Sequence, residues 1–178
     1  MILRAEYLLQ SQINLIFAAL MPDNRRVLQV MLRTGLRVSD VLELRREQLA
    51  RSFWVTECKT GKRRQCGLPD WLREEIDRAA AGSEWAFPSP LDITKHRSRQ
   101  AVWSDIKRVS RALRIPVNVG THSMRKIYAV ELMRKYGDIE RVRRDLAHDN
   151  PTTTAIYAMA DILAESAASR RVTFKRRR

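Results

Sequence analysis

His122 and Arg125 are the first residues whose types and spacing suggest chemistry. They lie three positions apart just after Thr121, a natural helix N-cap, so both side chains are expected on one side of the first helical turn. A histidine exchanges a proton near neutral pH, and an arginine binds a phosphate through two hydrogen bonds. The pair fits a site that acts on a phosphate, but alone it does not distinguish such a site from an ordinary basic helix end.

Tyr157 follows a second histidine, His148, in a segment whose Asn150-Pro151 pair predicts the start of a short helix. Three threonines in its first turn are indifferent helix formers, so we expect this segment to be loosely held until it docks. Next to two histidines and two arginines, the phenol of Tyr157 could attack a phosphodiester while the cations neutralise the developing charge. The alternative is an ordinary core or surface tyrosine, as expected for the other three.

Four basic residues, Lys95, His96, Arg97 and Arg99, lie just before a predicted helix. The helix macrodipole disfavours cations at this end, so the fold gains nothing from them. A phosphate there would be bound by the free amides and the basic side chains, and we interpret the segment as a contact to the DNA backbone. The alternative is a solvated basic loop.

The charge of the whole chain agrees with a polyanionic partner. Its 178 residues include 34 Lys and Arg against 20 Asp and Glu, a formal net charge of +14. Nucleic acid is the expected partner, because each neutralised phosphate releases counterions; a soluble basic surface is the alternative. Two cysteines and three histidines are too few for a four-cysteine zinc site or a disulfide framework.

The composition also bears on location. The apolar residues 15–21 are preceded by uncharged polar residues and are too few to cross a bilayer. We expect no export signal and no membrane partner, and a reducing cytoplasm as the compartment.

Hydrophobic periodicity predicts a mainly α domain with a small antiparallel β-sheet. Gly35 is expected to end one helix, and Ser39 or Asp40 to cap the next. Strands over 53–56 and 65–68 would form a hairpin around Thr60-Gly61-Lys62, and residues 85–87 would add a third short strand. Helices are expected near 13–20, 26–33, 39–44, 71–81, 100–113, 122–136, 139–147, from 151 past 157, and 161–168.

Five short segments, in order, resemble the successive motifs of the tyrosine recombinases, also called phage integrases. They are Thr-Gly-Leu-Arg-Val-Ser-Asp at 34–40, Lys-Thr-Gly at 59–61, His-Ser-Met-Arg at 122–125, Leu-Ala-His at 146–148 and Ala-Ile-Tyr at 155–157. Residues 85–89 and 98–102 resemble connecting segments of the family, so the resemblance covers about residues 10–158. Ala147 stands where the family usually has glycine, a small change that leaves the site intact.

The resemblance implies a role for each matched residue. Arg37 and Arg125 would hold the non-bridging oxygens of the scissile phosphate, and His148 would donate a further hydrogen bond to it. Asp40 would orient the active site rather than act on the substrate.

Proton transfer and nucleophilic attack are assigned in the same way. Tyr157 would be the nucleophile, and His122 would assist the transfer of its proton. Lys59, at the tip of the hairpin, would reach the minor groove and protonate the leaving 5′ oxygen; Lys62 is the alternative lysine. Lys62, Arg63 and Lys126 are also expected to contact DNA.

The implied reaction is site-specific cleavage and rejoining of DNA strands through a 3′-phosphotyrosine intermediate. It conserves the bond energy, so it needs neither ATP, nor a metal, nor another cofactor. Two alternatives stay open. One is a noncatalytic DNA-binding or regulatory protein with the same fold, which the filled catalytic positions oppose; the other is a type IB topoisomerase, which shares the chemistry.

The resemblance also implies a domain organisation and partners. Residues 1–168 would form a single catalytic domain and 169–178 a basic tail, without the N-terminal core-binding domain with which most members clamp DNA. A helix at about 159–168 would pack on its own domain or be exchanged between protomers. The expected partners are double-stranded DNA, copies of the chain as a tetramer on paired sites and a monomer in solution, and an accessory DNA-bending protein.

Overall fold

The computed structural model describes residue 8 and residues 10–146 of the chain. Its helices are α1 (Gln10–Ala19), α2 (Pro22–Thr34), α3 (Val38–Leu42), α4 (Asp70–Ala79), α5 (Arg99–Ala112), α6 (Thr121–Tyr136) and α7 (Ile139–Asp145), with the 3₁₀ turn η1 (Arg46–Gln48) and the strands β1 (Ser52–Thr56) and β2 (Arg63–Gly67). The predicted class, mainly helical with one small antiparallel sheet, is confirmed. Within the described ranges, no helix is long and apolar enough to cross a membrane.

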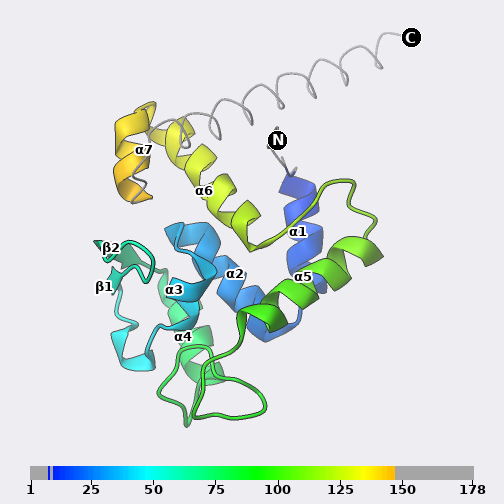
Figure 1. Cartoon of the computed structure of the whole chain (residues 1–178), viewed down its shortest axis with the longest axis vertical. Coiled ribbons are helices and arrows are strands. Elements are labelled where there is room, and N and C mark those ends of the chain that lie inside the picture. The colour runs from blue at the N-terminus through cyan, green and yellow to red at the C-terminus, as the bar shows by residue number, and fades with distance from the viewer. Residues whose placement is uncertain (1–7, 9, 147–178) are drawn as a thin grey trace.

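Helix α2 forms the centre of the fold (Figure 1). It packs against α3, α4, α5, α6 and strand β2, and buries Val27, Leu28, Val30 and Met31 almost completely. Burying an aliphatic side chain of this size contributes about 1.5–3 kcal/mol, so this contact face holds the helical layers together. The helix ends as predicted at Gly35, whose φ of 65° is left-handed and whose N–H bonds to the carbonyl of Met31.

The predicted hairpin is confirmed as strands β1 and β2. They pair antiparallel, with Phe53 opposite Cys66 and Val55 opposite Arg64. These four residues are buried, while Trp54 and Arg63 lie on the outer face with the guanidinium 5.1 Å from the indole ring centre. The strict alternation specifies the register. The connecting turn, residues 57–62, lies against α3, where the N–H of Cys58 donates to Asp40 at 2.9 Å.

The predicted third strand at residues 85–87 is wrong. This segment makes one isolated bridge between Trp85 and Arg45, followed by another between Pro88 and His96. Pro88 and Pro90 lack the N–H groups that a continuing ladder requires, so the chain forms a loop here.

Two predicted helix caps are also wrong. Helix α3 begins after Arg37, which occupies the N-cap position, and Asp40 lies in its first turn. Helix α6 begins after Gly120 rather than after Thr121, and Ser123 Oγ accepts the N–H of Gly120 at 3.2 Å. The helices expected from residue 151, the exchanged helix and the basic tail lie outside the described residues.

Candidate active site

Arg125 connects three parts of the fold. It lies in the second turn of α6, where its side chain is 3% exposed. Its Nη1 donates to the carbonyl of Gly35 at 2.5 Å, and its Nη2 donates to the carbonyl of Leu146. Burial, and secondly the charge of Arg37, lowers the pKa of Arg125 to about 10, so the guanidinium remains charged at neutral pH.

Arg37 and Arg125 converge on one carboxylate, that of Glu57. Nη1 of Arg37 donates to Oε2 of Glu57, and Nη1 of Arg125 lies 3.8 Å from Oε1. Arg37 retains 24% side-chain exposure, whereas Glu57 has none. The structure therefore places the two predicted phosphate-binding arginines together, one at the surface and one directly behind it.

Glu57 was not predicted from the sequence. It also accepts a hydrogen bond from Arg64 at 3.2 Å and one from the hydroxyl of Thr60 at 3.0 Å. Burial disfavours its ionisation, but the hydrogen bond and charge of Arg37, with Thr60 and Arg125, outweigh this and hold the pKa of Glu57 below its ordinary value. A signal was present: position 57 continues the inward-facing alternation of Phe53 and Val55, and a charge facing inward requires partners.

Asp40 is buried and joins the start of α3 to the hairpin turn. Its two carboxylate oxygens accept the backbone N–H of Arg37 at 3.2 Å and that of Cys58 at 2.9 Å. These contacts agree with the predicted orienting role, because Asp40 bonds to the backbone on both sides of the arginine site.

Lys59 lies exposed in the turn that Glu57 begins. The turn is closed by the bonds from Glu57 N to Lys62 O at 3.0 Å and from Gly61 N to Glu57 O at 2.8 Å. Gly61 adopts a left-handed φ of 65°, which permits the tight reversal. Lys59 is thus presented at the surface two residues from the carboxylate that binds both arginines.

His122 lies at the N-terminal end of α6, where the residue keeps contact with solvent while protein atoms cover part of its ring. Partial burial of its ring, followed by the positive charges of Lys126, Arg125 and Arg37, lowers its pKa. The imidazole is therefore mainly neutral at pH 7 and able to accept a proton. His148 and Tyr157 lie outside the described residues.

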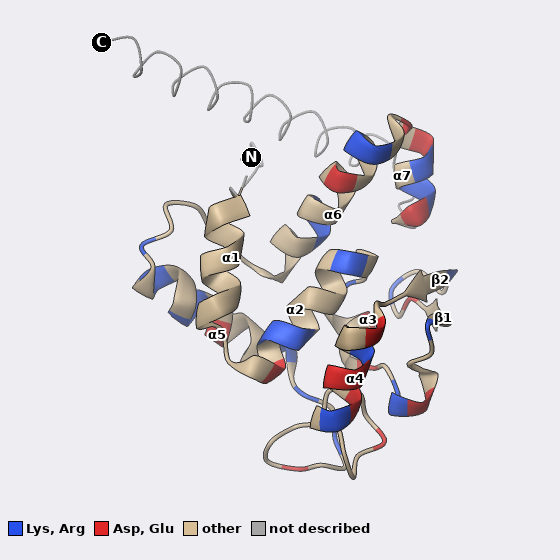
Figure 2. Ribbon diagram, turned by 180° about the vertical axis from the view of Figure 1, so that it is seen from behind, with Lys and Arg blue, Asp and Glu red and all other residues tan. Residues whose placement is uncertain are grey.

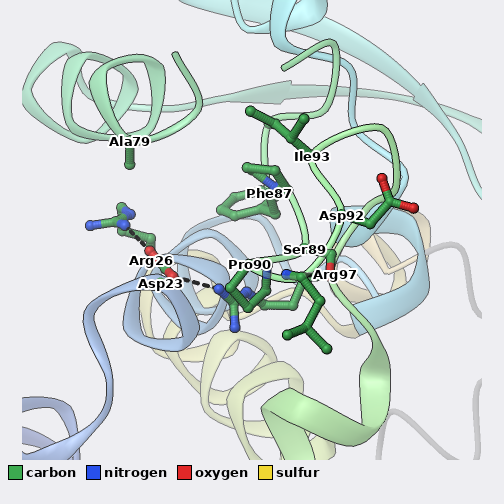
Figure 3. A pocket seen from close by; sticks show the side chains of 12 residues that line it. Asp23, Arg26, Ala79, Phe87, Ser89, Pro90, Asp92, Ile93 and Arg97 are labelled. Atoms are coloured by element: carbon green, nitrogen blue, oxygen red, sulfur yellow. Dashed lines mark hydrogen bonds and ion pairs between the residues drawn. The ribbon is translucent and has the colours of Figure 1, made fainter. Parts of the chain in front are cut away.

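Arg97 is not the backbone contact that the sequence predicted. Its side chain is 8% exposed and donates to Asp23 at 2.5 Å and to Asn24 at 3.2 Å. Figure 3 shows Arg97 and Arg26 on either side of Asp23, beside a cavity of about 300 Å³ between α2, α4 and the 86–93 loop. A guanidinium held by these partners is not available to DNA.

The other predicted DNA contacts divide by exposure. Lys126 is only 8% exposed, so little of it is accessible in the free domain, and its contact with DNA stays a prediction. The ring of His96 packs edge-on against Trp85, which gives it a structural role. The remaining candidates are exposed and stay predictions: Lys62, Arg63, Lys95 and Arg99.

The sequence is similar to those of known integrases and recombinases. The chain is 27% identical over 135 residues to the probable integrase/recombinase YoeC of Bacillus subtilis, covering 73% of this chain and 74% of YoeC. It is 29% identical over 144 residues to the tyrosine recombinase XerD of Lacticaseibacillus casei, covering 75% of this chain and 49% of XerD.

A solved structure shares the fold. The XerH site-specific recombinase, bound to its palindromic difH substrate, aligns with a TM-score of 0.72 and 19% identity, covering 93% of this chain and 53% of XerH. The chain thus spans about half the length of XerH and of the XerD relative. The profile of the Phage integrase family matches residues 6–162, and the chain belongs to this family, as its sequence motifs predicted.

Proposed function

We propose that this chain is the catalytic domain of a site-specific recombinase that cleaves and rejoins DNA strands through a covalent bond to Tyr157. The observation that carries the proposal is the convergence of Arg37 and Arg125, 88 residues apart in sequence, on the buried carboxylate of Glu57. A phosphodiester repels nucleophiles, and two fixed guanidiniums neutralise its oxygens without reorganising during the reaction.

Each further residue has one part in the reaction. His122, neutral at pH 7, accepts the phenolic proton of Tyr157, whose oxygen attacks phosphorus. The bond from phosphorus to the 5′ oxygen breaks, and Lys59 supplies the proton to that oxygen. His148 donates a hydrogen bond to the phosphate. The products are a 3′-phosphotyrosine and a free 5′ hydroxyl, and attack by another 5′ hydroxyl reverses the step.

The distribution of charged residues over the helices indicates which side of the domain binds DNA. Helix α4 carries four acidic residues among ten, whereas α5 carries four basic residues and one acidic residue (Figure 2). We propose that the duplex lies over the arginine site and the α5 side of the domain and away from α4, since phosphate contacts contribute a large part of the affinity. The DNA-bound XerH structure supports DNA as the partner.

The assembly is also a proposal. We propose a catalytic domain over residues 1–168, which acts as a tetramer on paired DNA sites, with the 159–168 helix on its own domain or exchanged. The accessory DNA-bending protein, the basic tail and the cytoplasmic location remain predictions.

A nicked suicide substrate tests the proposed function. Cleavage near the nick releases a short fragment, so the covalent intermediate accumulates and is read on a denaturing gel. We expect an adduct with the wild type in the presence of a chelator and none with Tyr157→Phe. DNA binding without any adduct would support the noncatalytic alternative, an adduct with Tyr157→Phe would refute the nucleophile, and relaxation of supercoiled DNA without a specific site would indicate a topoisomerase.

A further inference from the structure

Glu57 is the most completely buried carboxylate among the residues described, and it lies where three guanidiniums meet. Its exposed fraction is zero, against side-chain exposures of 24% for Arg37, 8% for Arg64 and 3% for Arg125. One carboxylate cannot balance three guanidinium charges, which repel one another. Because all three pair with Glu57, the position of its carboxylate determines how closely they lie. Because it is fully covered, Glu57 does not touch DNA itself.

Two of the three arginines are also held by backbone carbonyls. Arg64 donates to Thr34 O at 2.7 Å, and Arg125 donates to Gly35 and Leu146. Arg37 is the most exposed of the three, and its side-chain hydrogen bond goes to Glu57. Glu57 therefore transmits the fixed positions of the two buried guanidiniums to the one that faces solvent.

The same carboxylate also fixes the hairpin turn. Oε2, which accepts the bond from Arg37, accepts the hydroxyl of Thr60 at 3.0 Å. The backbone of Glu57 closes the turn through its bonds to Lys62 and Gly61. The oxygen that holds Arg37 is thus one hydrogen bond away from the residue next to Lys59.

We propose that Glu57 is a positioning residue that sets Arg37 against Arg125 and couples both to the turn carrying Lys59. The inference rests on the proposed function, because it assigns Glu57 to the reaction of that site. A guanidinium held from behind by a carboxylate presents its remaining N–H groups in one orientation, and the phosphate then meets a preorganised pair. The acting groups stay the arginines and the lysine; Glu57 works through them.

The test compares cleavage rate with DNA affinity in Glu57→Gln. The adduct is timed at saturating suicide substrate, and the dissociation constant is measured in a Tyr157→Phe background. We expect cleavage to slow by about 10–100-fold, because misplaced catalytic groups cost rate, while the dissociation constant changes by less than about threefold. Glu57→Asp, which keeps the charge on a shorter stem, should recover part of the rate.

A double variant separates positioning from simple charge balance. The double variant Glu57→Gln/Arg64→Gln removes the carboxylate and one buried guanidinium together, so the net charge of the cluster does not change. It therefore keeps the test usable if Glu57→Gln alone unfolds. We expect this double variant to remain slow. Recovery of the wild-type rate would overturn the proposal, because Glu57 would then serve only to neutralise Arg64.

Asp105→Asn is the matched control. Asp105 is another buried carboxylate, which accepts hydrogen bonds from Asn24 and Met21 at 2.9 Å, away from the arginine site. This variant should lower the melting temperature, because it loses the ion pair with Arg108 and weakens the other hydrogen bonds, and it should leave the cleavage rate within about twofold, because these partners lie outside the arginine site. An equal loss of rate in Asp105→Asn and Glu57→Gln would reduce Glu57 to a structural residue.

The reaction of the wild-type protein distinguishes failure of the proposed function from failure of the positioning role of Glu57. A wild type without an adduct overturns the proposed function and this inference with it. An active wild type whose rate equals that of Glu57→Gln overturns this inference alone.

Discussion

Nη1 of Arg125 donates a hydrogen bond to the carbonyl of Gly35 at 2.5 Å, across 90 residues of sequence. The acceptor belongs to the left-handed residue that ends α2, two positions before Arg37. The geometry of a helix end thus determines the position of a buried guanidinium on another helix, and residues around it should affect stability and cleavage in separable ways.

Gly35→Ala should destabilise the fold much more than Gly137→Ala. Both glycines have a φ of 65°, but a Cβ at Gly35 would lie 2.3 Å from the ring of Tyr128, while one at Gly137 meets nothing within 4 Å. We expect losses of about 1 kcal/mol at Gly137, from backbone strain, and about 2–4 kcal/mol at Gly35, from strain plus the clash. Urea unfolding measures both, and equal losses would mean that the contact with Tyr128 relaxes freely.

Arg125→Lys should impair cleavage more than binding. An ammonium keeps the charge but cannot reach the carbonyls of both Gly35 and Leu146 in the fork geometry of a guanidinium. We expect adduct formation to slow by about 100-fold, with DNA affinity changed by less than about threefold, because the charge it stabilises develops in the transition state.

Arg73→Lys is the control for that substitution, since Arg73 pairs with Asp70 on α4. It should react at the wild-type rate. If Arg125→Lys lowers DNA affinity as much as it lowers the cleavage rate, Arg125 already binds the DNA phosphate before the reaction, and its contribution is not specific to the transition state.

The rate of cleavage should fall on the acid side of an unusually low midpoint. His122 must be neutral to accept a proton, and burial together with the charges of Lys126, Arg125 and Arg37 lowers its pKa from 6.5. The rate should therefore be lost as the pH falls through a midpoint that lies below the ordinary pKa of histidine. Single-turnover cleavage between pH 5 and 8 measures this midpoint.

Lys126→Met tests how much the charge of Lys126 contributes to the lowered pKa of His122. Removing this charge should raise the midpoint towards the ordinary histidine value, whereas Lys135→Met, in the last turn of the same helix, should leave it in place. A midpoint that is the same in all three proteins would show that His122 is not the group that titrates.

Substitution of Arg97 should affect the stability of the fold, whereas substitution of Arg99 should affect DNA binding. Arg97→Met breaks a partly buried ion pair with Asp23, which keeps Arg26 as a partner, so we expect a loss of about 1–3 kcal/mol in stability and an unchanged salt dependence of DNA affinity. Arg99 is exposed at the start of α5, so Arg99→Met should leave stability unchanged and lower the slope of log affinity against log salt by about 1. The reverse pattern would restore Arg97 as a phosphate contact.

Local patterns in the sequence predicted most of the described elements. The apolar periodicity of α2 and the glycine after it predicted that helix. The β-branched and aromatic residues of β1, with the Thr60-Gly61-Lys62 turn, predicted the hairpin. The family motifs named Arg37, Arg125, Asp40 and His122, which the structure brings to one region. These signals succeed because they depend on neighbours within a few positions.

The failures involve partners far away in the chain. Arg97 looked like part of a basic surface because its partner, Asp23, lies 74 residues earlier. Glu57 went unnoticed because its three arginines come from a loop, a strand and a helix that only the tertiary fold brings together. The predicted cap of α3 lay two or three residues too late and that of α6 one residue too late. The observed caps, Arg37 and Gly120, are the residues whose backbone N–H groups bond to the side chains of Asp40 and Ser123.

The surplus of positive charge around Glu57 has a thermodynamic consequence. Three guanidiniums meet at one buried carboxylate, Glu57, and several of their other hydrogen bonds go to uncharged backbone carbonyls, which cancel no charge. The arginine site of the free domain therefore carries an excess of positive charge. We expect a phosphate that binds there to stabilise the folded domain, so that DNA binding should raise its melting temperature.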